Sequence, residues 1–476
     1  MKNDPTQHRP YQVDALIDAN LSVFSAPQSN LINSKQRLLR INARGIADPE
    51  FGLIEHGSIV LEEIEGVVTI LASGHEKEID ILNLPASIPQ LTLNSSVVMP
   101  AMVNAHTHLD LTHIGPQPHD PAEGFVQWVN MIREGRKSDP QEVRDAVALG
   151  ILKCLKGGCI AIGDIAGAPR GILTDAPLLE LADSPLIGVS YLEFFGIGKT
   201  AISACQKIES YFSDHYPQTL NAITDRFVRL GLQPHAPNTV DLSVYRWARL
   251  KAHSFGLPIS THLAETIEER AFIEQAQGPQ RTMLEDFGVW DDSVLDHIGK
   301  GNHPAKHLLS DRQIDDMQNQ QLPSYLVAHM NDAPDEAIEL LKQSNTSVAY
   351  CPRASSYFGA HQHFGAHRYI DMLNAGVNVC LGTDSIVNLD TADRISILDE
   401  MRFLWNRDKV EPKTLIQMST TNGAQALGLD PAEFTLQAQT RPWGLIALPI
   451  DPECPKLWPE LMSSNLSPQW VFLRRK

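Results

Sequence analysis

Eight short runs of apolar and β-branched residues recur through the middle of the 476-residue chain, with longer stretches of helical character between them. The runs occupy residues 96–103, 159–165, 186–192, 227–232, 257–261, 325–328, 346–350 and 377–381. Each run is continuously apolar rather than alternating, which is typical of parallel strands that are covered on both faces. This repetition constrains the fold more than any other feature of the sequence.

The segments between the runs support the same interpretation. Residues 140–155 and 335–342, for example, carry helical patterns. Strand and helix alternate over about 330 residues, as a TIM barrel requires. We therefore predict an α/β protein with a (β/α)₈ TIM barrel over residues 96–430. An open doubly wound sheet is the alternative on periodicity alone.

The two flanks of the chain have a different pattern. Residues 58–61 and 67–71 are short alternating segments, and the tail from about residue 436 is rich in proline and ends in an apolar stretch at 469–473. We expect residues 1–95 and 431–476 to form one small β-sandwich domain from the two chain ends.

Composition limits the partners and the compartment. The chain has 39 basic and 57 acidic residues, a net charge of -18, which disfavours binding to nucleic acid phosphates and to anionic membranes. Its six cysteines form no close CxxC pair, and the polar N-terminus lacks an apolar leader segment. No stretch reaches the roughly 18 uninterrupted apolar residues of a membrane span. We expect a cytoplasmic protein with no nucleic acid or membrane partner.

Two histidines, His106 and His108, directly follow the first apolar run. Residues spaced i, i+2 on a strand point to the same face, so both imidazoles would look into the mouth of the barrel and share one cation. An HxH pattern alone is weak, but its position after an apolar run makes it informative.

A second cluster follows the fifth run, where His262 is placed as a third metal ligand and Glu265 follows in the turn. A carboxylate there would reach a substrate without binding the metal, although an acid that stabilises a helix N-terminus is the alternative. His329 ends the sixth run and Asp384 follows the eighth. Taken singly, His329 fits a core or rim residue and Asp384 fits a helix cap equally well, but together the four strand ends predict one site.

These motifs resemble those of the amidohydrolase superfamily, in particular its cytosine deaminase, S-adenosylhomocysteine deaminase and triazine chlorohydrolase branch. The resemblance covers about residues 93–428 and rests on NAHTH, THLAE, the strand ending in AH at 329, CPR at 351–353 and LGTDS. It implies a mononuclear site with His106, His108, His262 and Asp384 as metal ligands, and with Glu265, His329 and Asp384 as catalytic residues.

The resemblance also implies substrate contacts, and it has two departures, of which Pro100-Ala101 in place of the usual Pro-Gly should not affect the chemistry. His235, in Gln-Pro-His-Ala-Pro, matches a substrate-contacting histidine, and Arg353 either contacts the substrate or packs under the loop. The asparagine usual after the CPR segment is replaced by Ala354-Ser-Ser, which leaves the substrate open. The end of the fourth run has no lysine of the kind that dinuclear relatives carboxylate, which favours one divalent metal. Zinc suits the histidine and carboxylate donors, and iron(II) is the alternative.

We therefore expect hydrolytic deamination of a small amino-substituted heterocycle, purine-like or pyrimidine-like, by an activated water. A chlorohydrolase of a triazine-like ring is the alternative enzyme, and a non-catalytic scaffold is the alternative class. The resembled enzymes are commonly homodimers. One loop carries His361, His363 and His367. We expect these to be surface imidazoles, and a substrate-binding rim or an adventitious metal site are the alternatives.

Overall fold

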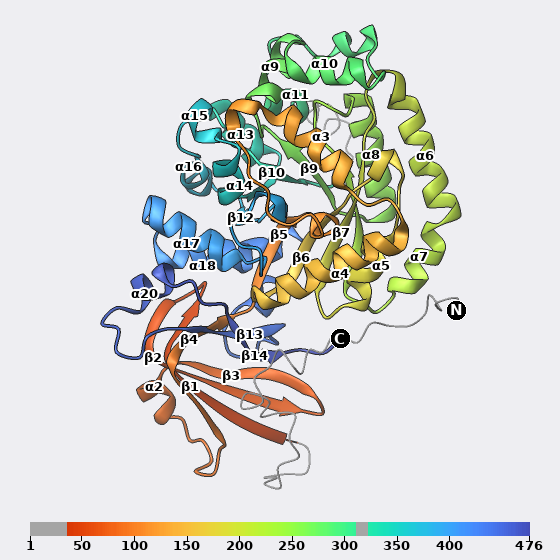
Figure 1. Cartoon of the computed structure of the whole chain (residues 1–476). Helices are drawn as coiled ribbons and strands as arrows, with labels where there is room; N and C mark the ends of the chain where they lie inside the picture. Colours follow the sequence, from red (N-terminus) through yellow and green to blue (C-terminus); the bar gives the residue numbers. More distant parts are fainter. Residues whose placement is uncertain (1–35, 311–321) are drawn as a thin grey trace.

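The computed structural model describes residues 36–310 and 322–476. Eight parallel strands follow one another in the order β12-β11-β10-β9-β8-β7-β6-β5 and form the predicted barrel, with helices around it (Figure 1). The strands are β5 Met102–Thr107, β6 Cys159–Ala166, β7 Ile187–Phe194, β8 Val228–Pro234, β9 Ile259–Leu263, β10 Tyr325–His329, β11 Ser347–Tyr350 and β12 Val379–Leu381. The TIM barrel prediction is confirmed.

The first apolar run was predicted as one strand, but the structure divides it between two. Residues 96–103 contribute to two strands, because β4 (Gln90–Pro100) belongs to the second sheet and β5 begins only at Met102. Residues Ser96 to Pro100 pair antiparallel with β13 (Gly444–Pro449). Pro100 has no N–H to continue a ladder, and the chain leaves the sheet there.

The barrel closes at a seam between its first and last strands. Thr107 and Asp384 form a parallel bridge across the seam. The Asn104 side chain accepts a hydrogen bond from Thr383 N at 3.1 Å and donates one to Thr383 Oγ1 at 2.8 Å. The seam therefore joins the first and last sequence motifs directly.

Helices cover the outside of the barrel (Figure 1). The predicted helical segments are observed as α4 Pro140–Lys156 and α13 Asp335–Gln343. Asp139 caps α4 by accepting hydrogen bonds from the amides of Gln141 and Glu142. The other helices of the barrel part are α3 Phe125–Gly135, α5 Ala176–Asp183, α6 Ala201–Asp214, α7 Tyr216–Ile223, α8 Leu242–Phe255, α9 Ile267–Gln275, α10 Pro279–Asp286, α11 Pro304–Leu309, α14 Pro352–Tyr357, α15 Ala360–Phe364, α16 Tyr369–Asn374, α17 Ile397–Asp408, α18 Pro412–Ser419 and α19 Thr421–Ala426.

The two chain flanks meet in a second sheet, which lies below the barrel in Figure 1. Its six strands run in the order β14-β13-β4-β1-β2-β3 and form one hydrogen-bonded sheet with its own hydrophobic cluster. The remaining elements of this region are β1 Gln36–Asp48, β2 Gly52–Ile64, β3 Val67–His75, β14 Gln469–Leu473, α2 Glu76–Asp80 and α20 Leu457–Ser463. The expected small β domain is thus present, and residues 1–35 of its N-terminal segment lie outside the described residues.

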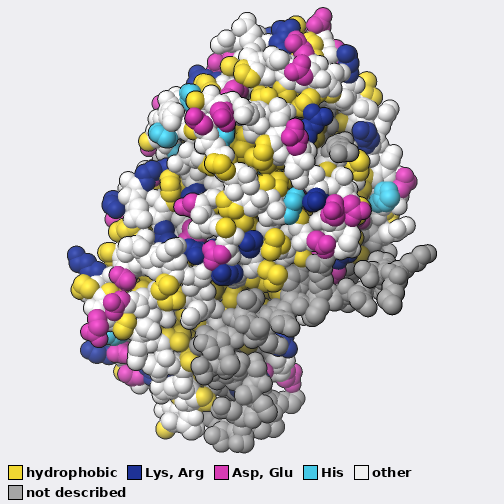
Figure 2. Space-filling model, viewed as in Figure 1, with side chains coloured by type: hydrophobic (Ala, Val, Ile, Leu, Met, Phe, Trp, Pro, Cys, Tyr) yellow, Lys and Arg dark blue, Asp and Glu magenta, His cyan; other side chains and the backbone are white. Residues whose placement is uncertain are grey.

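The second sheet is attached to the barrel by buried contacts. Trp470 of β14 is 2% exposed and donates its indole N–H to Leu155 O of α4 at 2.8 Å. Acidic and basic side chains are interspersed over the face of the molecule in Figure 2. Among the described residues, every helix is too short or too polar to cross a bilayer.

Candidate active site

Three histidines converge at the carboxyl ends of the barrel strands. His106 and His108 lie on and just after β5, and His262 lies on β9. One ring nitrogen of each lies within 4.8 Å of those of the other two, and the three residues are 0%, 9% and 4% exposed. The His106 ring stands edge-on to those of His108 and His262, at centroid distances of 5.2 and 5.0 Å.

Asp384 joins this cluster through the seam of the barrel. Its Oδ1 lies 3.3 Å from His108 Nε2 and 3.7 Å from His106 Nε2. Its Oδ2 accepts a hydrogen bond from Asn388 Nδ2 at 2.6 Å, which orients the carboxylate. The backbone of Asp384 has a φ of 56°, in the left-handed region that a non-glycine residue rarely adopts. Such a conformation is typical of functional positions.

The donor atoms of the cluster fit a divalent cation. His262 Nδ1 lies 2.8 Å from the carbonyl of His235 and donates to it, which leaves Nε2 as a bare lone pair directed at the cluster. That Nε2 lies 3.4 Å from His108 Nε2. Both ring nitrogens of His106 are buried without a hydrogen-bond partner. Buried imidazole nitrogens without partners are costly, and a cation bound by nitrogen and carboxylate donors would satisfy them.

The protonation states agree with a ligand set. Burial and the neighbouring His106 lower the pKa of His262 to about 3, and burial lowers the pKa of His108 well below its usual value. Burial disfavours an ionised Asp384, but the adjacent imidazoles of His106, His108 and His329 outweigh this effect, so the pKa of Asp384 is lowered. Neutral imidazoles and an ionised carboxylate are the forms that bind a metal.

Glu265 lies beside the cluster in the turn after β9. The backbone N–H groups of Ala264 and Glu265 donate to the buried carboxylate of Glu269 at 3.0 and 2.7 Å, and this fixes the turn. Thr266, rather than Glu265, caps the following helix α9. Burial, and then the charge of Asp384, raise the pKa of Glu265 well above its usual value. A carboxyl group with a raised pKa keeps its proton to a higher pH than usual, which suits it to donate a proton.

His329 ends β10 inside the same cluster. Its Nε2 lies 3.5 Å from Glu265 Oε1, and its ring stacks on that of His262 at a centroid distance of 5.5 Å. It is 1% exposed and forms a second candidate ligand group with His106 and Asp384. The structure thus brings together all six residues predicted as metal ligands or catalytic groups.

The comparisons with known proteins identify the family and the fold. The model of the Amidohydrolase family matches residues 97–432. The chain belongs to the amidohydrolase family. It is 25% identical over 390 residues to the 5-methylthioadenosine/S-adenosylhomocysteine deaminase of Pyrococcus furiosus, which covers 79% of this chain and 82% of that protein.

Two solved structures share the fold of this amidohydrolase. The aminofutalosine deaminase of Helicobacter pylori, in complex with methylthio-coformycin, superposes with a TM-score of 0.68 at 19% identity and covers 92% of this chain and 99% of its own. The atrazine chlorohydrolase of Arthrobacter aurescens TC1, complexed with zinc, superposes with a TM-score of 0.61 at 16% identity, covering 92% of this chain and 95% of its own. These two structures share the fold, and the family match over residues 97–432 confirms the suspected superfamily.

The two predicted substrate contacts of the amidohydrolase lie in different surroundings. The ring of His235 lies 4.9 Å from that of His262, and its Nδ1 is 2.7 Å from Thr239 Oγ1. Arg353 is 6% exposed, and its Nε donates to Glu400 Oε1 at 2.6 Å while its Nη1 donates to Asp390 at 2.9 Å. These contacts match the alternative in which Arg353 packs under its loop. His235 thus borders the cluster, and the substrate-binding role of either residue stays a prediction.

The sequence interpretation missed a buried charged network at the same end of the barrel. Arg136, which follows α3, donates to Asp110 through Nε at 2.6 Å and through Nη2 at 3.3 Å, and its Nη1 lies 3.4 Å from Glu193 Oε2. Gly167 leaves the space that the guanidinium fills. Asp164 accepts a hydrogen bond from Leu109 N at 3.1 Å, next to His108, and burial raises its pKa to about 7. The sequence signal that could have revealed this network is a single carboxylate in each of two otherwise apolar strands, at positions 164 and 193.

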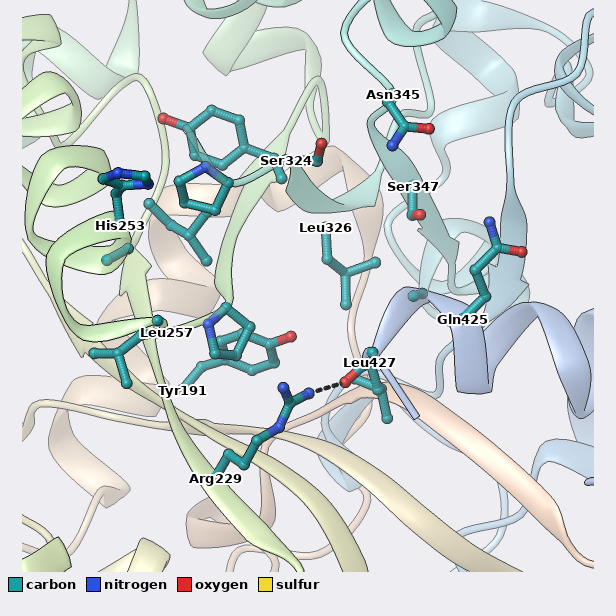
Figure 3. A pocket seen from close by; sticks show the side chains of 18 residues that line it. Tyr191, Arg229, His253, Leu257, Ser324, Leu326, Asn345, Ser347, Gln425 and Leu427 are labelled. Carbon is teal, nitrogen blue, oxygen red and sulfur yellow. Dashed lines mark hydrogen bonds between the residues drawn. The ribbon is translucent and has the colours of Figure 1, made fainter. Parts of the chain in front are cut away.

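Two hollows lie at opposite ends of the barrel. A small one beside Glu265 is lined by aromatic and histidine side chains, including His119, Phe125, Phe358 and His363. A larger cavity of about 390 Å³ lies at the amino ends of β8 to β11 and is drawn in Figure 3. There Arg229 donates to the carbonyl of Leu427. The larger cavity is lined by none of the clustered residues, whereas the smaller hollow is lined by Glu265 and so adjoins the candidate active site.

Replacing Arg136 by Met tests the network. It would leave the carboxylates of Asp110 and Glu193 buried without their cation, and losing one partner of a buried ion pair costs about 3–5 kcal/mol. We expect the free energy of unfolding in urea to fall by that amount. The matched control is Arg368→Met, because Arg368 pairs with Asp335 and Asp371 at the surface, where such pairs contribute about 0–1 kcal/mol. Equal effects of the two substitutions would contradict a special role for Arg136.

Proposed function

We propose that this amidohydrolase removes an amino group from a small heterocycle by hydrolysis, with one divalent cation held by His106, His108, His262 and Asp384. The observation that carries the proposal is the convergence of these ligands with Glu265, a carboxyl group whose pKa is raised. Addition of water to an amidine-like ring carbon needs a proton on the adjacent ring nitrogen. A protonated carboxyl beside the ligands supplies that proton.

The cation, when bound, lowers the pKa of a water ligand to about 7 and so provides a nucleophile at neutral pH. Asp384 accepts the proton of the attacking water, since its carboxylate faces the ligand set and is ionised. His329 donates a hydrogen bond to the oxygen that adds to the ring. Glu265 protonates the ring nitrogen and then takes the proton of the added hydroxyl, while the proton held by Asp384 passes to the amino group, which leaves as ammonia. His235, beside His262, contacts the substrate.

The relatives support an amine as the leaving group. The Pyrococcus furiosus relative is named a deaminase of two adenosine derivatives, and its likeness covers most of both chains. We therefore propose a purine-like or nucleoside-like substrate. A triazine chlorohydrolase is the second candidate, because the atrazine enzyme shares the fold. Zinc is the proposed metal, as in that structure, with iron(II) as the alternative.

We also propose the cytoplasm as the compartment and keep a homodimer as an untested expectation. The six cysteines are all free, and five of them are buried, which is compatible with a reducing environment.

A screen for released ammonia and chloride tests the reaction. The purified metal-loaded protein is incubated with adenosine derivatives, free aminopurines and aminopyrimidines, and chlorotriazines. We expect ammonia from at least one amino heterocycle and no chloride. Chloride release alone would establish the second candidate, and no turnover with stoichiometric metal would favour a scaffold.

Substituting Glu265 by Gln tests the proton donor. We expect kcat to fall at least about 100-fold, the lower range for a general acid, with metal content unchanged because Glu265 is outside the ligand set. In the unmodified enzyme, kcat falls as the pH rises through the elevated pKa of Glu265, because the acid form is lost. Glu336→Gln, an exposed carboxyl on α13 that pairs with Lys306, is the control and keeps full activity. Full activity of the Glu265 variant would disprove the assignment.

A further inference from the structure

His367 lies much closer to the chemistry than a surface loop residue would. The exposed His361 and His363 of the same loop agree with the prediction of surface imidazoles, whereas His367 is half-buried. Its Nε2 lies 2.9 Å from the backbone carbonyl oxygen of His329. Its ring stacks on Tyr350 of β11 at a centroid distance of 3.7 Å and an interplanar angle of 17°.

The hydrogen bond fixes the tautomer of the ring. A carbonyl oxygen only accepts, so Nε2 of His367 carries the proton. Burial lowers the pKa of His367 to about 4, so the ring is neutral and Nδ1 is a bare lone pair. This Nδ1 is buried and has no hydrogen-bond partner. An unsatisfied buried acceptor is unfavourable, so packing alone would favour an apolar ring such as Phe. What histidine adds at this position is the N–H directed at His329.

The carbonyl that receives this bond belongs to an unusual stretch of backbone. His329 and Met330 have φ values of 76° and 51°, both in the left-handed region. Met330 N donates to Leu263 O at 2.9 Å, which ties one side of the turn to β9. His367 ties the other side, at the His329 carbonyl. Two consecutive non-glycine residues in this region persist only where the surroundings hold them.

Tyr350, on which His367 stacks, is itself held in place by its neighbours. The hydroxyl of Tyr350 accepts a hydrogen bond from Arg407 Nη2 at 3.0 Å, and Arg407 pairs with Asp408. Tyr369 also stacks on Tyr350, and its hydroxyl donates a hydrogen bond to Asp408 at 2.7 Å. The imidazole of His367 therefore stacks on a tyrosine ring that its own contacts hold in place.

We propose that His367 is a positioning residue for His329: its Nε2–H holds the His329 carbonyl, and so keeps the strained end of β10 in the conformation that directs the His329 imidazole at Glu265 and the metal ligands. The inference rests on the proposed function, because it assigns His329 a part in the chemistry. It extends that function to a residue that does not touch the substrate.

Two substitutions separate the hydrogen bond from the packing. His367→Phe keeps a ring on Tyr350 but removes the N–H, whereas His367→Gln keeps an N–H donor of similar reach but removes the ring. His361→Phe, an exposed position in the same loop that does not line the hollow beside Glu265, is the matched control. For each variant, kcat, KM, metal content and melting temperature are measured with the substrate found in the ammonia screen, and the Phe variant is crystallised.

We expect His367→Phe to lower kcat about 10–100-fold, the range seen when an orienting partner is lost. KM should stay within about twofold and metal content should not change, because neither substrate nor metal ligands are touched. His367→Gln should recover most of kcat, and His361→Phe should resemble the unmodified enzyme. The crystal structure should show the His329 backbone relaxed and its ring turned from Glu265.

Unchanged kcat in His367→Phe, or a loss that His367→Gln does not recover, would overturn the proposal. If the unmodified enzyme deaminates nothing, the proposed function fails first. The crystal structure then decides separately, since an unmoved His329 in the Phe variant would show that His367 does not position it.

Discussion

The hydrogen bonds across the seam between β5 and β12 are the constraint on which the rest of the site depends. Thr383 N and Asp384 N both donate to the carbonyl of His106 at 3.0 Å, and Thr107 Oγ1 donates to the carbonyl of Asp384, 277 residues away in sequence. These bonds close the barrel. They also bring Asp384 beside His106 and His108. Closure of the fold and assembly of the ligand set are therefore one structural event.

The mouth of the barrel carries conformational and electrostatic costs that the rest of the fold offsets. Ala264, His329 and Asp384, at the ends of three strands, all have positive φ values. Each places a polar side chain, or the turn that carries one, against the histidine cluster. Buried carboxylates surround the same cluster, and Arg136 balances two of them. A large apolar core shared by the barrel and one side of the second sheet supplies the stability that permits this arrangement.

Much of the site could be predicted from the sequence because it lies at strand ends. Parallel strands of a barrel all end at the same face, so a polar ligand-type residue after an apolar run, such as His262 or Asp384, is placed by the run itself. What could not be predicted depends on contacts between distant loops. Arg136 lies 26 residues beyond its partner Asp110, and the partner of Arg353 is Glu400 on another helix. His367 acts through a backbone carbonyl, which leaves no pattern in the sequence. The break between β4 and β5 was hidden because the last residues of β4 and the first residues of β5 form one apolar run.

The most direct test of the central claim is anomalous diffraction from crystals of the metal-loaded protein, with data collected on both sides of the metal absorption edge. We expect one strong anomalous peak, within about 2.0–2.2 Å of a ring nitrogen from each of His106, His108 and His262 and of an Asp384 oxygen. A metal-loaded crystal with its peak elsewhere, or with no peak among these four side chains, would contradict the account.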